Sequence, residues 1–268
     1  MKAQDSLDPV CAAILERLDT VERSDGVRIL YACESGSRAW GFPSRDADYD
    51  VRFIYLRPRD WYLSIDIETK RDVIELPIDG LLDINGWDLR KALKLLRKLN
   101  PALLEWLSSP VVYREQDDFA DALINRVRDK VPLASCAYHY LHMARGNFRG
   151  YLQGDTVKVK KYLYVLRPLL AVRWIEQHGT LPPVLFRALL DGVLNDGPIK
   201  REVEEMLRLK TEGLERDEGP RIAIVHEYCE RELGRLQNPK FSPGNHPAAQ
   251  LDFDALFLDF LARYAPAG

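Results

Sequence analysis

The sequence predicts an α+β fold, in which a small mixed sheet with flanking helices is followed by an all-α C-terminal region. Two observations predict it. Strand-like segments are confined to the first 115 residues, and beyond Tyr113 the apolar residues recur at helical spacing instead. The composition is that of a globular protein, because 46% of the 268 residues are hydrophobic and 29% are charged.

The first module begins with a helix. Asp8-Pro9 is an N-cap and first-turn pair, and apolar residues from Val10 to Val21 follow at helical spacing. A loop rich in Gly, Ser, Arg and Pro covers 34–47, and Asp88 is expected to cap a second helix. Strands are predicted at 27–33, 48–56, 73–76 and 81–85, the last two joined by a turn at 77–80.

The rest of the chain is helical by pattern. We place the boundary between a sheet domain and a helical domain at residues 115 and 116, so that the domains are 1–115 and 116–268. Helices are predicted at 117–130, 133–152, 156–178, 183–194, 198–213, 219–236 and 251–264.

The stretch from Glu34 to Leu56 carries the chemistry. A Gly36-Ser37 turn follows an apolar strand, and after a ten-residue gap Asp48 and Asp50 enter the next strand. Residues two apart in a strand share a face, so the two carboxylates repel each other unless a cation neutralises them. Oxygen ligands without His or Cys suit Mg²⁺ or Mn²⁺, and the turn offers backbone amides and a hydroxyl to phosphate oxygens. The pattern therefore predicts phosphoryl or nucleotidyl transfer.

Charge and cysteine content exclude several other classes. The formal net charge is −3, so any affinity for nucleic acid must come from a local patch. The four cysteines form no CxxC pair, which disfavours a disulfide framework and a structural zinc site. No secretory leader is recognisable and no apolar run approaches roughly 18 residues, so we expect a cytoplasmic protein with no membrane partner.

The Gly-Ser, ten-residue gap and Asp-x-Asp pattern resembles the signature of the DNA polymerase beta-type nucleotidyltransferase superfamily. The fuller sequence resembles a bacterial and phage branch associated with RNA repair. The matching strings lie within roughly residues 25–175, and they are ESGSRAWGFPS, DADYDVRFIY, DINGWDLRKAL, NPALLEW and VKKYLYVLRPLLAVRW.

The resemblance implies a third carboxylate on a strand beside the Asp-x-Asp pair. Asp83 is our choice as metal ligand or general base, and Glu75 is its competitor. Asp48, Asp50 and Asp83 would hold two Mg²⁺ or Mn²⁺ ions, while Gly36 and Ser37 would contact the nucleotide phosphates. The helical domain would complete the cleft for nucleotide and acceptor.

A basic stripe is predicted on the helix at 156–178. Lys160, Tyr164 and Arg167 fall at i, i+4 and i+7, with Lys161 beside them. One interpretation is that Lys160 or Lys161 and Arg167 bind the triphosphate of an NTP, with Tyr164 near its sugar or base. The other is a solvated helix face.

We therefore expect a metal-dependent transferase that moves an NMP from an NTP to a hydroxyl, with release of pyrophosphate. The favoured acceptor is an RNA 3′ end such as that of tRNA. The alternatives are an antitoxin-like transfer of AMP to a protein, modification of a small molecule such as an antibiotic, or a module that binds nucleotide without turnover. The base preference and the oligomeric state are left open.

Overall fold

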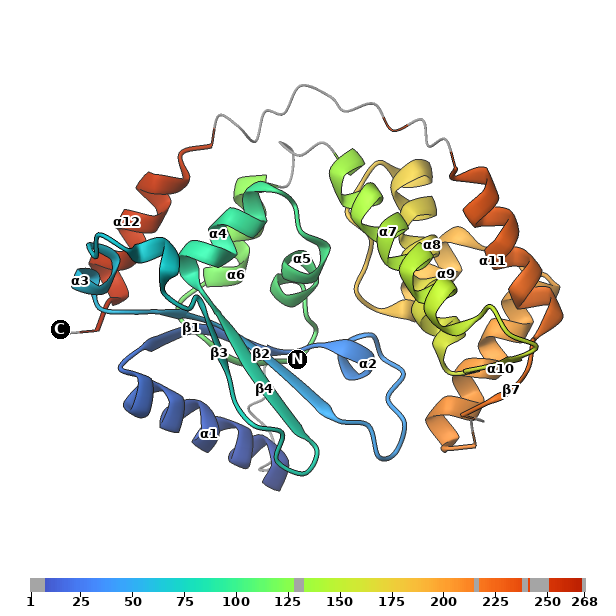
Figure 1. Ribbon diagram of the computed structural model, residues 1–268, viewed down its shortest axis with the longest axis horizontal. Helices are drawn as coiled ribbons and strands as arrows, with labels where there is room; N and C mark the ends of the chain where they lie inside the picture. Colours follow the sequence, from blue (N-terminus) through green and yellow to red (C-terminus); the bar gives the residue numbers. More distant parts are fainter. Residues whose placement is uncertain (1–7, 128–132, 215–216, 238–240, 242–250, 267–268) are drawn as a thin grey trace. The chain divides into compact units, whose positions relative to one another are not determined.

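The computed structural model describes residues 8–127, 133–214, 217–237, 241 and 251–266. This part of the chain forms two compact units. The described residues within 1–39, 48–131 and 246–268 form what we call the sheet unit, and those within 40–47 and 132–245 form the helical unit. The fold is α+β as predicted, with a five-stranded mixed sheet and a helical C-terminal region (Figure 1).

The sheet has the strand order β3-β4-β2-β1-β5. Its central strands β2 and β4 run parallel, and the other neighbours pair antiparallel. The predicted turn at 77–80 does join a hairpin, β3–β4, although β4 continues further than predicted. The strands are β1 (Arg28–Glu34), β2 (Tyr49–Leu56), β3 (Val73–Glu75), β4 (Leu82–Asp88) and β5 (Val112–Glu115).

Helices cover both faces of the sheet (Figure 1). On one face, Ile14, Leu18 and Val21 of α1 pack on alternate β2 residues such as Val51 and Phe53, which are fully buried. α4, α5 and α6 contact the sheet from the other side. The helices and turns of this unit are α1 (Pro9–Asp25), α2 (Gly36–Ala39), α3 (Arg59–Tyr62), the 3₁₀ turn η1 (Ile67–Thr69), α4 (Leu89–Arg97), α5 (Pro101–Leu107), α6 (Phe119–Val127) and α12 (Phe253–Tyr264).

The helical unit is built around α8, which packs against α7, α9 and α11. It also contains a two-stranded sheet, β6 (Thr156–Val157) with β7 (Gly219–Pro220), that the sequence pattern did not predict. Its helices are α7 (Leu133–Tyr151), α8 (Lys161–His178), α9 (Phe186–Val193), α10 (Pro198–Glu212) and α11 (Ala223–Arg235).

The two units are not the consecutive segments 1–115 and 116–268. α6 and α12 belong to the sheet unit. The ring centroid of Phe119 in α6 lies 6.2 Å from that of Tyr31 in β1 and 5.0 Å from that of Phe260 in α12. Residues 40–47 belong to the helical unit, where the Trp40 carbonyl accepts a hydrogen bond from the Phe186 N–H at 2.9 Å. Apolar packing between distant segments therefore decides the division.

No helix within the described ranges is both long enough and apolar enough to cross a membrane.

Candidate active site

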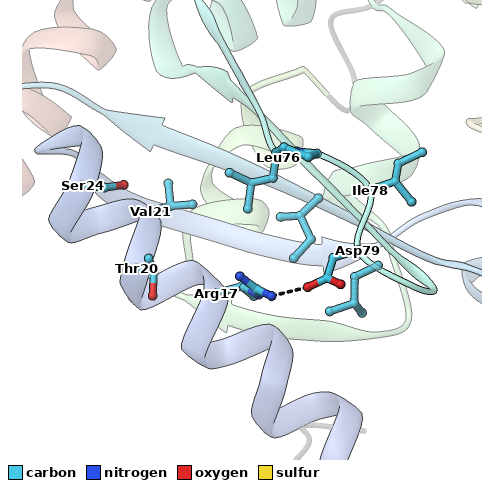
Figure 2. Close-up of a pocket in the computed structure, with 10 residues that line it drawn as sticks. Arg17, Thr20, Val21, Ser24, Leu76, Ile78 and Asp79 are labelled. Carbon is cyan, nitrogen blue, oxygen red and sulfur yellow. Dashed lines mark hydrogen bonds and ion pairs between the residues drawn. The ribbon is translucent and has the colours of Figure 1, made fainter.

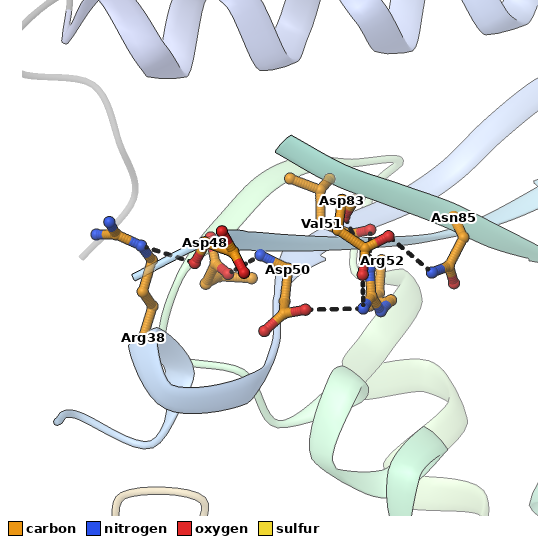
Figure 3. Close-up of polar contacts among 8 residues, drawn as sticks. Arg38, Asp48, Asp50, Val51, Arg52, Asp83 and Asn85 are labelled. Carbon is orange, nitrogen blue, oxygen red and sulfur yellow. Dashed lines mark hydrogen bonds and ion pairs between the residues drawn. The ribbon is translucent and has the colours of Figure 1, made fainter. Parts of the chain in front are cut away.

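Asp50 and Asp83 lie side by side on neighbouring strands. β2 and β4 pair in parallel with Asp50 opposite Asp83, so both side chains leave the same face of the sheet (Figure 3). Each side chain is about one-third exposed, at 31% and 34%. The predicted neighbour of the Asp-x-Asp pair is thus at the expected place, although its chemical role stays a prediction.

Asp48 is not part of the strand. β2 begins at Tyr49, and Asp48 lies exposed just before it. Its carbonyl accepts a hydrogen bond from Arg38 Nε at 3.1 Å, and the Arg38 guanidinium stacks on the Tyr49 ring at 3.6 Å. These contacts fix the start of β2, so Asp48 lies just outside the strand that carries Asp50.

Arg52 joins the two carboxylates. Its Nη2 donates to Asp50 Oδ1 at 2.9 Å and to Asp83 Oδ2 at 2.7 Å (Figure 3). Within the described part of the chain, no three Asp, Glu, His or Cys side chains are grouped as ligands of one metal ion. The roles of Asp48, Asp50 and Asp83 as metal ligands stay predictions, and in this structure the cation shared by Asp50 and Asp83 is the Arg52 guanidinium.

The electrostatics of Asp50 reflect this crowding. Burial raises the pKa of the Asp50 carboxyl, the Arg52 guanidinium opposes that shift, and the negative charges of Asp83 and Asp48 add to it. A cation beside Asp50 is therefore favourable. Carboxylate oxygens are the donors that Mg²⁺ and Mn²⁺ prefer, and binding of such an ion by this pair stays a prediction.

Gly36 forms the wall of the site next to Asp50. Its φ of +60° is in the left-handed region, and a Cβ added there would lie 2.2 Å from Asp50 Oδ2. Ser37 follows in the short helix α2 and is 9% exposed. The Gly-Ser turn and the second Asp of the Asp-x-Asp pattern are therefore in direct contact.

Glu34 is a buried carboxylate that the sequence analysis missed. It is 1% exposed, accepts a hydrogen bond from the Asp50 N–H at 2.7 Å and another from the Tyr113 hydroxyl. Burial raises its pKa. Glu34 thus ties the end of β1 to the start of β2 and to β5, two residues before Gly36 in the sequence.

A sequence signal existed for both missed residues. Arg52 is two residues beyond Asp50 and so shares its strand face, and Glu34 is an acidic residue ending an apolar strand immediately before the Gly-Ser turn.

A sequence model of the RNA repair pathway DNA polymerase beta family matches residues 10–259, nearly the whole chain. The chain belongs to this family. The match confirms the resemblance to polymerase beta-type nucleotidyltransferases and extends it well beyond residues 25–175.

A relative from Bacillus subtilis (strain 168), the uncharacterized protein YcgL, is 51% identical over 223 residues, which are 83% of this chain and 85% of that protein. Among solved structures, a nucleotidyltransferase-like protein from Exiguobacterium sibiricum 255-15 is similar over 95% of this chain and 91% of that one, with a TM-score of 0.33 and 15% identity.

Glu75, the competing third carboxylate in this polymerase beta family member, lies at the edge of the sheet. It pairs in register with Asn85 rather than with Asp83, and its side chain is 59% exposed in an ion pair with Arg71. The structure therefore brings Asp83, and not Glu75, next to Asp50.

The residues of the predicted basic stripe on α8 have individual partners in the structure and do not form a uniformly solvated helix face. α8 begins at Lys161, so Lys160 is its N-cap residue, and Lys160 forms an ion pair with Asp217 at 2.6 Å. Lys161 lies over the Tyr164 ring at 4.5 Å. Burial, and then the positive charges of neighbouring lysines, lower the pKa of Lys161.

Arg167 lies in the interior of the helical unit. It is 2% exposed, its guanidinium stacks on Trp40 at 4.5 Å, and Nη2 reaches the Val184 carbonyl at 3.4 Å. The expected exposed stripe of Lys160, Tyr164 and Arg167 is thus wrong at Arg167, because Trp40 of the Gly-rich loop covers it. The predicted nucleotide contacts of Lys160, Lys161, Tyr164 and Arg167 stay predictions.

A pocket of about 370 Å³ lies elsewhere on the sheet unit, between α1 and the β3–β4 turn (Figure 2). Leu82 and Ile84 line it, and since they alternate with Asp83 along β4, the pocket is on the opposite face of the sheet from the carboxylates. An Arg17–Asp79 ion pair lies at its side (Figure 2). None of the predicted site residues lines this pocket.

Proposed function

We propose that this protein transfers an NMP from an NTP to a hydroxyl of an acceptor, which we take to be an RNA 3′ end. The acceptor oxygen forms a bond to the α-phosphorus as the bond from that phosphorus to the β-phosphate oxygen breaks, and pyrophosphate leaves. The observation that carries the proposal is the paired register of Asp50 and Asp83 beside Gly36, where a side chain has no room.

Asp50 and Asp83, with Asp48 as the predicted third ligand, would hold Mg²⁺ or Mn²⁺. When bound, the metal would neutralise phosphate charge and lower the pKa of the attacking hydroxyl. The fit rests on the two carboxylates that already share one cation, Arg52.

The chain's own groups would do the rest. Asp83 would accept the proton of the acceptor hydroxyl, because a base must lie within hydrogen-bond reach of that proton. Gly36 and Ser37 would donate backbone and hydroxyl hydrogen bonds to the β- and γ-phosphates. Glu34, through the Asp50 N–H, would keep Asp50 against the Gly-Ser turn.

The preference for RNA rests on family membership. The net charge of −3 adds nothing to it, so contact with RNA phosphates would come from local groups such as Lys160 and Lys161 in the helical unit.

The test is incubation with each α-labelled NTP, Mg²⁺ or Mn²⁺, and pooled tRNA. We expect label in RNA with an intact 3′ end and none in RNA whose terminal ribose has been oxidised by periodate. The Asp50→Asn/Asp83→Asn double variant is the matched control and should transfer no label. Transfer by that variant at the parental rate contradicts the assigned site.

Other outcomes would replace part of the proposal. Label in protein from a cell lysate would indicate an AMP-transferase that acts on proteins, and label in a small molecule would indicate an antibiotic-type acceptor. Nucleotide binding without transfer to any acceptor would indicate a binding module and overturn the transferase proposal.

A further inference from the structure

We propose that Arg52 is a resident cation that holds Asp50 and Asp83 together without metal and weakens their affinity for a free divalent ion. The inference rests on the proposed function only in taking Asp50 and Asp83 as the metal-binding pair.

The first argument is the anchoring of Arg52. In addition to its contacts with the two carboxylates, Nη1 donates to the Val51 carbonyl at 3.0 Å and to the Asp83 carbonyl at 2.8 Å. The side chain is 14% exposed. Four oxygens therefore hold the guanidinium in place beside the carboxylates (Figure 3). Because a guanidinium is always protonated, a permanent positive charge lies at that position.

The second argument is which oxygens the guanidinium takes. It occupies Asp50 Oδ1 and Asp83 Oδ2, one oxygen of each carboxylate, from a single nitrogen. Asp83 Oδ1 is 3.5 Å from Asn85 Nδ2, and Asp50 Oδ2 faces Gly36. A metal ion bound by both carboxylates therefore competes with Arg52 for Asp50 Oδ1 and Asp83 Oδ2.

The third argument is charge. Without Arg52 the two carboxylates would repel each other at paired positions of adjacent strands, and with Arg52 they are neutralised in part before any ion arrives. A fixed positive charge also repels a divalent ion at the same place. Arg52 therefore both stabilises the metal-free site and lowers its affinity for free ions.

A functional consequence follows for substrate binding. A divalent ion that arrives on the triphosphate of an NTP brings negative charge with it, which offsets the repulsion from Arg52, whereas a free ion does not. The structure thus favours entry of metal as its nucleotide complex over prior binding of free metal.

The test is equilibrium binding of free Mn²⁺, followed by electron paramagnetic resonance in the absence of nucleotide. Arg52→Gln should bind Mn²⁺ about tenfold more tightly than the parent, or better, which is about 1.4 kcal/mol. Arg52→Lys keeps the charge and should stay within about threefold of the parent. Addition of Asp83→Asn to Arg52→Gln should abolish the gain.

A gain of less than twofold in Arg52→Gln, or equal gains in Arg52→Gln and Arg52→Lys, would overturn the inference. Should Arg52→Gln fail to fold, the test is an NMR titration of the parent protein with Mg²⁺ at millimolar concentration. Mg²⁺ should shift the side-chain signal of Arg52, which is assigned by its absence from the spectrum of Arg52→Lys. Binding of Mg²⁺ that leaves that signal unmoved overturns the inference. Transfer to RNA by the parent is measured separately, so a failed Arg52 prediction leaves the proposed function standing.

Discussion

Gly36 combines two constraints that are separable by experiment. Its left-handed backbone disfavours any side chain, and the space its Cβ would need is filled by Asp50 Oδ2. Gly26, at the end of α1, has the same φ of +60° but nothing within 4 Å of a Cβ. The two glycines therefore form a matched pair in which only Gly36 has a neighbour to displace.

We expect Gly26→Ala to cost about 1–2 kcal/mol of unfolding free energy and to leave transfer unchanged, because only backbone strain is added. Gly36→Ala should cost at least as much and also slow transfer about a hundredfold, since it displaces the Asp50 carboxylate. Chemical denaturation and a single-turnover assay measure the two effects. Equal activity of the two variants would mean that the contact with Asp50 is unimportant.

Asp83 and Glu75 can be ranked by a second pair of substitutions. Asp83→Asn should slow transfer by about 10²- to 10⁴-fold with NTP binding nearly intact, because the proposed base is lost. Glu75→Gln should change the rate about twofold or less, because this carboxylate is 59% exposed and its ion pair is with Arg71, away from Asp50. The reverse ranking in a single-turnover assay would move the base to Glu75.

At the scale of the element, Asp88 shows how a cap can be tied to pH. It ends β4 and caps α4, where Oδ1 accepts from the Arg90 N–H at 2.8 Å and Oδ2 from the Tyr62 hydroxyl at 2.6 Å. The capping role was predicted from sequence and is confirmed. At 1% exposure, burial raises the pKa of Asp88 from 3.8 to about 6.

The sign of the pH effect follows from linkage. The Asp88 carboxyl loses its proton near pH 3.8 in the unfolded chain and near pH 6 in the folded protein. Between these pH values the folded state therefore binds more protons than the unfolded state. Compared with Asp88→Asn, which still caps but does not titrate, the parent should lose about 3 kcal/mol of unfolding free energy as pH rises through this window. The difference should stay constant above about pH 6.

Urea denaturation of the parent and Asp88→Asn at several pH values across that window measures this difference. A difference that does not vary with pH would mean that Asp88 titrates alike in both states.

α8 is held in the helical unit partly by Arg167. Because that guanidinium is buried under Trp40, we expect Arg167→Ala to lower the unfolding free energy by about 2 kcal/mol or more through lost packing and hydrogen bonding. Lys160→Ala, which removes a partly exposed ion pair, should cost less than about 1 kcal/mol. Thermal unfolding compares them, and an unchanged transition in Arg167→Ala would return this residue to a purely ligand-binding role.

At the scale of the whole molecule, the C-terminal helix completes the sheet unit. Phe260 of α12 is 2% exposed and contacts Phe119, and Phe257 contacts Tyr62 at 5.0 Å. α12 thus packs against residues of the sheet unit that precede it by more than 130 positions in the sequence. Stability of the sheet unit therefore depends on residues far from the Asp-x-Asp pattern.

We expect Phe260→Ala to lower the unfolding free energy by about 3–5 kcal/mol, because a large buried ring leaves a cavity. Leu258→Ala, at a 57% exposed position of the same helix, should stay within about 0.5 kcal/mol of the parent. Calorimetry compares the two. Similar melting of both variants would mean that α12 contributes little to the core.

The sequence by itself determined the features that depend on local pattern. Alternation and helical spacing gave β1, β2, the β3–β4 hairpin and most helices, and the Asp88 cap follows from residue type and position. The Gly-Ser turn, the ten-residue gap and the Asp-x-Asp pair lie within 15 residues, 36–50, and they pointed to the polymerase beta-type superfamily. The longer matching strings indicated the branch associated with RNA repair, which the family match confirms.

Tertiary structure alone decided which distant residues meet. The parallel register of β2 with β4 places Asp83 at Asp50, leaves Glu75 aside and inserts Arg52 between the two carboxylates. Trp40 covers Arg167, and α12 returns to the sheet unit. Local periodicity fixes which face a residue occupies but not which strand or helix lies against that face, because that choice depends on the combined packing of the whole core.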